Sequence, residues 1–163
     1  MAGLPGVGKS TLSSALGRAL NWHVIDKDRD KEVLMQQGLE EEHAGRAAYE
    51  LAFETARRQL IKQQSSVILD SSSLYSFILE NAQDIVCSVP NAQLKVILCV
   101  AGKYLRDERL RNRPYQITRI RVDPATIIDY LQLFNHLPTD RLTIYTTDPL
   151  EKSLTAAIEY LRS

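Results

Sequence analysis

The sequence predicts a three-layer α/β fold, in which helices cover both faces of a mostly parallel, five-stranded sheet. Short apolar segments alternate with segments of helical periodicity along the whole chain. The segment 94–100 is almost entirely apolar, as is typical of a strand covered on both faces. A glycine-rich motif near the N-terminus opens directly into an amphipathic helix.

Composition predicts a single globular domain spanning residues 1–163. The chain is 44% hydrophobic and 25% charged, and its twenty basic residues balance twenty acidic ones, so no net charge favours nucleic acid or a membrane surface. The longest apolar run, 96–101, is too short to cross a bilayer, and no signal peptide is visible. Two cysteines, Cys87 and Cys99, are interpreted as buried thiols. Together these features predict a cytoplasmic protein with no membrane partner.

The glycine-rich motif has the form G-x-x-x-x-G-K-[ST], which predicts a phosphate-binding loop. We expect its residues and the following threonine to bind ATP: Gly3, Leu4, Pro5, Gly6, Val7, Gly8, Lys9, Ser10 and Thr11. Such a loop turns backbone N–H groups inward, and the next helix directs its positive end at the phosphates. Lys9 is predicted to act on the β- and γ-phosphates and Ser10 to bind Mg²⁺. A ligand-free flexible loop is the alternative, and the helix that follows argues against it.

A strand is missing from the predicted sheet. The motif should follow a buried strand, but only Met1 and Ala2 precede Gly3. We expect about 5–8 further apolar residues upstream, which is a typical strand length. An extension that changed neither stability nor nucleotide affinity would count against this expectation.

The remaining elements follow from periodicity and from turn and cap residues. Apolar residues at positions 12, 15, 16, 19 and 20 predict a helix after the motif. The expected strands are 22–26, 66–70, 94–100 and 142–146. The further helices are expected at 30–37, 40–64, 74–88, 102–112 and 124–134, with 114–123 irregular. Asp148 and Pro149 predict the cap and first turn of the last helix.

Acidic residues follow two of the predicted strands. Asp26 and Asp28 follow one strand and Asp70 ends another, so all three should reach the edge of the sheet where ligands bind. We interpret Asp28 as the base that accepts a proton from the acceptor hydroxyl. Asp26, Asp70 and Ser10 are the candidate groups for Mg²⁺ and its bound water, and a substrate contact is the second role left open for Asp26. The alternatives are a solvated charged turn for the first two acids and a turn or cap role for Asp70.

An arginine-rich segment, about residues 105–123, is predicted to form a lid. Its arginines are Arg106, Arg109, Arg111, Arg113, Arg119 and Arg121. Arginine forks match phosphate oxygens, and a closed lid excludes water from the transferred group. We predict that Arg109 and Arg113, one helical turn apart, are the catalytic pair. For two or three of the six arginines, we expect only a solvated helix face.

These motifs together resemble the small P-loop kinases. That group includes shikimate kinase, gluconate kinase, chloramphenicol phosphotransferase, zeta-toxin type enzymes and the kinase half of polynucleotide kinase. The resemblance rests on the phosphate loop, on Ile25-Asp26-Lys27-Asp28, on Asp70 and on the 108–113 segment of the lid, and it covers nearly the whole chain. It implies a P-loop NTPase fold, with Asp28 at the substrate hydroxyl.

The resemblance also implies that the adenine lies near Thr147 and Asp148, after the last strand. The Leu69-Asp70-Ser71-Ser72 stretch departs from the glycine-rich turn of shikimate kinase, which argues against shikimate as the acceptor.

The functional prediction is an ATP-dependent kinase that transfers the γ-phosphate to a hydroxyl or amine of a small molecule. Two alternatives are an ATP-binding regulatory module that has lost its chemistry and a nucleic-acid 5′-end kinase. Zero net charge and 7% aromatic residues argue against a long nucleic-acid groove. The motifs typical of a GTPase, Asn-Lys-x-Asp and Asp-x-x-Gly, do not occur in the sequence. The acceptor and the oligomeric state stay open.

Overall fold

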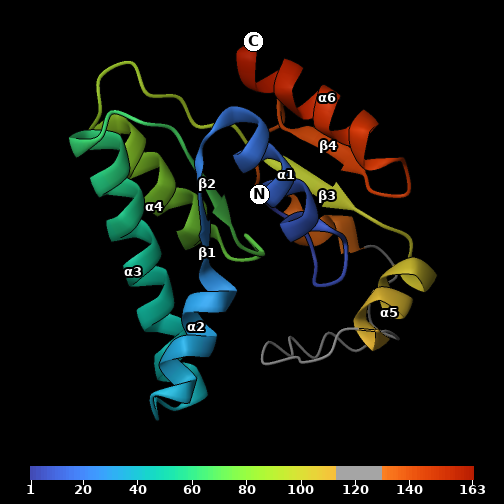
Figure 1. Ribbon diagram of the computed structural model, residues 1–163, viewed down its shortest axis with the longest axis horizontal. Helices are drawn as coiled ribbons and strands as arrows, with labels where there is room; N and C mark the ends of the chain where they lie inside the picture. The colour runs from blue at the N-terminus through green and yellow to red at the C-terminus, as the bar shows by residue number, and fades with distance from the viewer. Residues whose placement is uncertain (113–129) are drawn as a thin grey trace.

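The computed structural model describes residues 1–112 and 130–163. Its elements in chain order are α1 (Lys9–Leu20), β1 (His23–Asp26), α2 (Lys27–Gln36), α3 (Glu41–Lys62), β2 (Val67–Asp70), α4 (Ser76–Cys87), β3 (Ile97–Val100), α5 (Lys103–Arg111), the 3₁₀ helix η1 (Tyr130–Phe134), β4 (Leu142–Tyr145) and α6 (Leu150–Arg162). Figure 1 shows α3 and α4 on one side of the strands and α1 and α6 on the other. The three-layer arrangement predicted from the alternation of elements is therefore confirmed.

The strands form two parallel pairs that the first residues of the chain hold together. β1 pairs with β2, and β3 pairs with β4. The Met1 nitrogen donates to the Leu69 carbonyl of β2 at 2.8 Å. On the other side, the Ala2 nitrogen donates to the Ile97 carbonyl at 2.8 Å, and the Ala2 carbonyl accepts from the Cys99 nitrogen at 2.9 Å. The order is thus β1–β2–Ala2–β3–β4, with a very short central segment.

Small residues allow the layers to approach each other closely. The buried positions of α3 recur every four residues and are all alanine: Ala44, Ala48, Ala52 and Ala56. This small-residue stripe brings α3 against β1 and β2. Gly3 plays the same part beside β3, because a Cβ there would lie 2.5 Å from the Cys99 carbonyl oxygen. These contacts place the phosphate loop at the carboxyl edge of the strands.

One predicted helix begins earlier than expected. The helix expected at 30–37 begins at Lys27, because the Asp26 carboxylate accepts hydrogen bonds from the backbone nitrogens of Asp28 and Arg29, both at 3.1 Å. The charged stretch after β1 is therefore the first turn of α2, in which Asp28 and Arg29 are exposed. This shift decides which side chains of the stretch face the neighbouring helix.

Other details also differ from the sequence prediction. Cys87 is exposed, whereas Cys99 is buried as expected. Pro149 is the N-cap residue of α6, and the Asp148 carboxylate pairs with Lys152 at 2.9 Å instead of capping the helix. The predicted helix 124–134 lies mostly outside the described residues, and 130–134 form η1. None of the helices in the described ranges has the length and hydrophobicity needed to cross a membrane.

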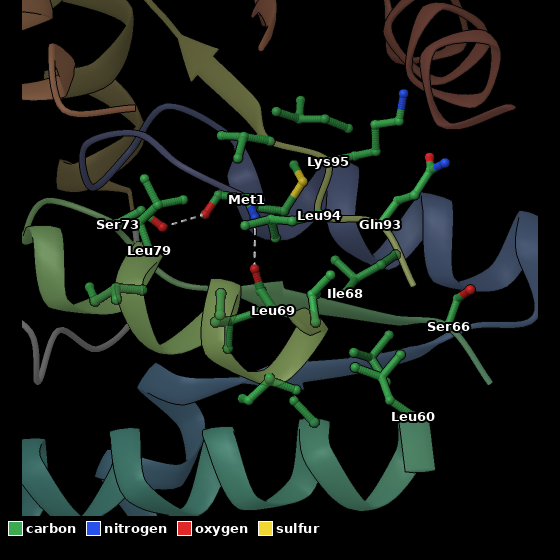
Figure 2. A pocket seen from close by; sticks show the side chains of 18 of the residues that line it. Met1, Leu60, Ser66, Ile68, Leu69, Ser73, Leu79, Gln93, Leu94 and Lys95 are labelled. Atoms are coloured by element: carbon green, nitrogen blue, oxygen red, sulfur yellow. Dashed lines mark hydrogen bonds between the residues drawn. The ribbon is translucent and has the colours of Figure 1, made fainter. Parts of the chain in front are cut away.

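An apolar cavity of about 230 Å³ lies between β2 and β3, adjacent to Met1. Figure 2 shows the two hydrogen bonds of Met1, whose nitrogen donates to the Leu69 carbonyl and whose carbonyl accepts from the Ser73 hydroxyl. Ile68 and Val96 also line the cavity. Burial lowers the pKa of the Met1 ammonium, because the charged form is poorly solvated there. A gap in the strand order thus contains a buried amine and apolar side chains.

Extending the chain into this gap is expected to stabilise it. An added segment Val-Leu-Ile-Val-Leu before Met1 converts the amine to an amide and buries apolar side chains between the strand pairs. We expect a gain of about 2 kcal/mol, which raises Tm by about 4–8 °C in a domain of this size. Thermal unfolding followed by circular dichroism measures this, with Ser-Gly-Ser-Gly-Ser as the length-matched control. Equal Tm values for the two extensions would contradict the expected stabilisation.

Candidate active site

The amino end of α1 has the features of an anion site. Gly8 is the N-cap residue, with φ of 88°, and no side chain caps this helix. The first turn of α1 contains no acidic residue. The Lys9 ammonium is buried beside the loop and donates to the Leu4 carbonyl at 3.0 Å. The helix end therefore presents its dipole, and a positive charge, to the space above the loop.

A pocket of about 480 Å³ opens from this loop toward α2 and α3. It shares no lining residue with the apolar cavity between β2 and β3. The lining comes from the phosphate loop, both helices and the segment after β2: Pro5, Gly6, Gly8, Lys9, Ser10, Lys27, Asp28, Lys31, Glu41, Glu42, Gly45, Tyr49, Ser72 and Tyr75. The structure thus brings the predicted base Asp28 together with five residues of the predicted phosphate loop, namely Pro5, Gly6, Gly8, Lys9 and Ser10.

Asp26 and Asp70 lie at neighbouring strand ends beside this pocket but do not line it. Asp70 is buried and accepts a hydrogen bond from the Ser13 hydroxyl at 2.9 Å. Burial is the main cause that raises the pKa of Asp26, and the charges of Asp70 and Asp28 add to it. Oxygen donors of this kind suit Mg²⁺, and a cation between the acids would remove their repulsion. Within the described ranges, no group of three or more His, Cys, Asp or Glu forms a metal cluster.

Helix α5 lies against the phosphate loop. A Cβ on Gly6 would fall 2.8 Å from Cγ of Arg106. Arg109 donates to the Thr146 hydroxyl at 2.9 Å and to the Thr146 carbonyl at 2.8 Å, and this hydroxyl donates to the Val7 carbonyl at 2.7 Å. Arg109 therefore links the lid segment to the end of β4 and to the loop. The other predicted lid residue, Arg113, lies outside the described residues.

The predicted site residues did not include Lys27, Lys31, Glu41 or Tyr49, which also line the pocket. Lys27 pairs with Asp28 at 2.6 Å, and its ammonium lies 4.8 Å from the centre of the Tyr49 ring. Lys31 pairs with Glu41 at 2.8 Å. Recognising that α2 begins at Lys27 would have placed Lys27 and Lys31 one turn apart on one helix face. No local pattern indicates Glu41 or Tyr49, because α3 contributes them through tertiary packing.

Comparison with known families agrees with this geometry. A family profile described as AAA domain matches residues 1–137. The chain belongs to this AAA domain family. The matched range includes the phosphate loop, both acidic strand ends and α5. A comparison with curated protein sequences found no significant match.

Solved structures with the same fold are P-loop kinases. A presumptive kinase from Chloroflexus aurantiacus superposes with a TM-score of 0.73 at 25% identity, covering 99% of this chain and 93% of its own. APS kinase from Mycobacterium tuberculosis, in complex with AMPPNP and APS, gives a TM-score of 0.67 at 17% identity, covering 99% and 95%. A gluconokinase from Sinorhizobium meliloti gives 0.60 at 17%, covering 99% and 89%. This AAA domain therefore has the fold of a P-loop kinase.

Proposed function

We propose that this protein is an ATP-dependent phosphotransferase that moves the γ-phosphoryl group to a hydroxyl or amine of a small molecule. The observation that carries the proposal is the pocket that joins Lys9 and Ser10 to Asp28. A phosphate loop alone binds nucleotide, whereas a kinase also needs an acceptor space with a base beside it. The kinase fold of the structural relatives supports this assignment.

Each residue has a distinct role in the proposed transfer. The phosphate loop, Gly3 to Thr11, holds the triphosphate through its amides and the dipole of α1. Asp28 takes the proton from the acceptor hydroxyl as its oxygen attacks the γ-phosphorus, and the bond to the bridging oxygen of ADP breaks. Lys9 stabilises the charge on the transferred phosphoryl oxygens.

Ser10, Asp26 and Asp70 are the proposed holders of Mg²⁺. The bound ion supplies charge neutralisation for the β- and γ-phosphates. Ser10 lines the pocket, and the two aspartates lie at adjacent strand ends in register. Asp70 is oriented by Ser13, whose own position on α1 ties the acid to the helix that bears Ser10.

Acceptor-dependent turnover tests the proposal. ATP consumption is measured with Mg²⁺, alone and with a panel of hydroxyl- and amine-bearing small molecules. A kinase shows turnover that an acceptor stimulates, with phosphorylated acceptor detected by mass spectrometry. Tight ATP binding without turnover for any acceptor would instead indicate a regulatory binding module. Stimulation only by a 5′-hydroxyl oligonucleotide would indicate a nucleic-acid end kinase.

Loss of Arg109 is expected to weaken ATP use. The Arg109→Ala variant loses two hydrogen bonds to Thr146, beside the predicted adenine position and the phosphate loop. We expect kcat/KM for ATP to fall by about 10–100-fold, because each charge-assisted bond contributes roughly 1.5 kcal/mol or more. Steady-state kinetics measure this. Arg111 on the same helix is exposed and has one long bond, 3.4 Å, to the Asp107 carbonyl, so Arg111→Ala is the matched control. Equal effects of the two changes would contradict a special role for Arg109.

A further inference from the structure

We propose that the acceptor is a small hydroxyl-bearing anion and that Lys27 and Lys31 bind its carboxylate, sulfate or phosphate group. The inference rests on the proposed function, because it assigns a ligand to the two lysines that α2 contributes to the same pocket. The two lysines stand one turn apart near the start of α2, on the same helix face. Both line the pocket that also contains Lys9 and Ser10.

The two lysines are buried more deeply than the carboxylates that pair with them. The side chains of Lys27 and Lys31 are 9% and 10% exposed, whereas those of Asp28 and Glu41 are 50% and 60% exposed. A buried ammonium needs a counter-charge, but an ion pair with an exposed carboxylate contributes little stability. An anion that enters the pocket can therefore replace or join these carboxylates as the partner of the lysines.

The surroundings of Lys27 favour a retained positive charge. Its ammonium lies over the Tyr49 ring, whose face is electron-rich, and Tyr49 packs edge-on against Phe77 at 5.2 Å between ring centres. Burial raises the pKa of Tyr49 to about 12, so its hydroxyl is neutral at physiological pH. The aromatic wall thus supports a cation without adding a competing anionic group.

The charges that face the pocket balance before the acceptor enters. The groups are three lysines, Lys9, Lys27 and Lys31, and three acids, Asp28, Glu41 and Glu42. The proposed base is one of these acids, and it is held by Lys27 at 2.6 Å. An acceptor anion that takes Lys27 as its partner releases the Asp28 carboxylate, which can then accept the acceptor's hydroxyl proton. A neutral acceptor leaves the Lys27–Asp28 pair intact, so binding and catalysis are both weaker.

Inorganic sulfate tests the anion site directly. The protein is first saturated with Mg²⁺ and AMPPNP, which occupy the phosphate loop, and sulfate is then titrated by calorimetry at constant ionic strength. We expect saturable binding that Lys31→Gln weakens about tenfold or more, because a charge-assisted contact is lost. Lys31→Arg should retain binding within about threefold. Lys62→Gln, which removes an exposed charge at the far end of α3, is the matched control and should bind as the parent does.

Absence of saturable sulfate binding, or equal affinity in Lys31→Gln and the parent, would overturn the proposal. Thermal unfolding of each variant verifies that it is folded. If Lys31→Gln is unstable, Lys31→Arg still tests the proposal. Arginine keeps the positive charge at this position, so this variant must still bind sulfate.

Matched acceptors test the consequence for turnover. Two pairs share a hydroxyl skeleton and differ in charge: D-gluconate with D-glucitol, and D-glycerate with glycerol. For a pair that is phosphorylated, we expect kcat/KM at least tenfold higher for the anion, with a contribution from kcat as well as KM. Lys27→Gln should reduce the ratio of kcat/KM for the anion to kcat/KM for the neutral compound. Equal use of the neutral member would contradict the inference.

Different results would contradict the proposed function and the proposed anion site. Lack of Mg²⁺-dependent AMPPNP binding, or lack of any acceptor-stimulated turnover, defeats the proposed function. In that case, sulfate binding is measured by calorimetry in the Lys9→Ala variant without nucleotide. This change weakens the phosphate loop as a competing site for sulfate. Sulfate binding there that depends on Lys31 supports the site, and its absence overturns it.

Discussion

The Lys9→Ala variant is expected to lose acceptor-stimulated ATP turnover by at least about 10³-fold, because a group aimed at developing charge in a water-poor site has effects of this size. The Lys9 ammonium is buried and held by the Leu4 carbonyl at 3.0 Å, so it is already positioned before nucleotide binds. Removing it leaves the transferred phosphoryl oxygens without this positive partner.

The measurement is kcat and kcat/KM for ATP, with phosphorylated product quantified. Alanine favours helix, so the first turn of α1 should persist, and thermal unfolding verifies this. Lys62→Ala removes a positive charge from the exposed end of α3 and should leave both constants within about twofold. A loss below tenfold in Lys9→Ala would show that the phosphate loop is not the catalytic centre.

The second large effect is expected for Asp28→Asn, with kcat reduced about 10²–10⁴-fold, the range of general-base assistance. Asparagine keeps the size of the side chain and its ability to accept a hydrogen bond from Lys27, but it cannot take the acceptor proton. Because Asp28 is contributed to the pocket by α2 and not by the phosphate loop, the affinity for Mg²⁺ and ATP should stay within about threefold.

The control for this change is Asp30→Asn, two residues further along α2. Asp30 does not line the pocket, so its substitution should alter kcat by less than about threefold. Pre-steady-state phosphoryl transfer separates chemistry from product release. If Asp28→Asn and Asp30→Asn behaved alike, another group would have to act as the base.

Periodicity and turn chemistry predicted most of the fold. The run 94–100 reads as a buried strand because side chains on both faces pack against helices, and β3 is buried at every position. The phosphate loop is also predicted from neighbouring residues. Its glycines set the backbone shape, and its lysine and serine lie within one turn of them. These features depend on neighbouring residues alone, so no tertiary information is needed to find them.

The start of α2 illustrates a local feature that was predicted incorrectly. Asp26 was interpreted as an end-of-strand acid, but its carboxylate also caps the helix that follows at once. A strand that passes into a helix without a loop gives no glycine or proline signal, so the boundary is hidden in a charged run. This error concealed the shared face of Lys27 and Lys31.

The pairing of distant groups was decided only by tertiary structure. Lys31 meets Glu41, Lys27 meets Tyr49, and Arg109 meets Thr146 across 37 residues. Each pair depends on how helices and strand ends pack. Long charged side chains have many rotamers, and only this packing selects one of them. The sequence by itself therefore determined the phosphate loop, the element order and the acids at the strand ends. The pocket beside the loop and its charge pairs arose from the fold, because a site assembled from separate elements has no spacing that can be read along one chain.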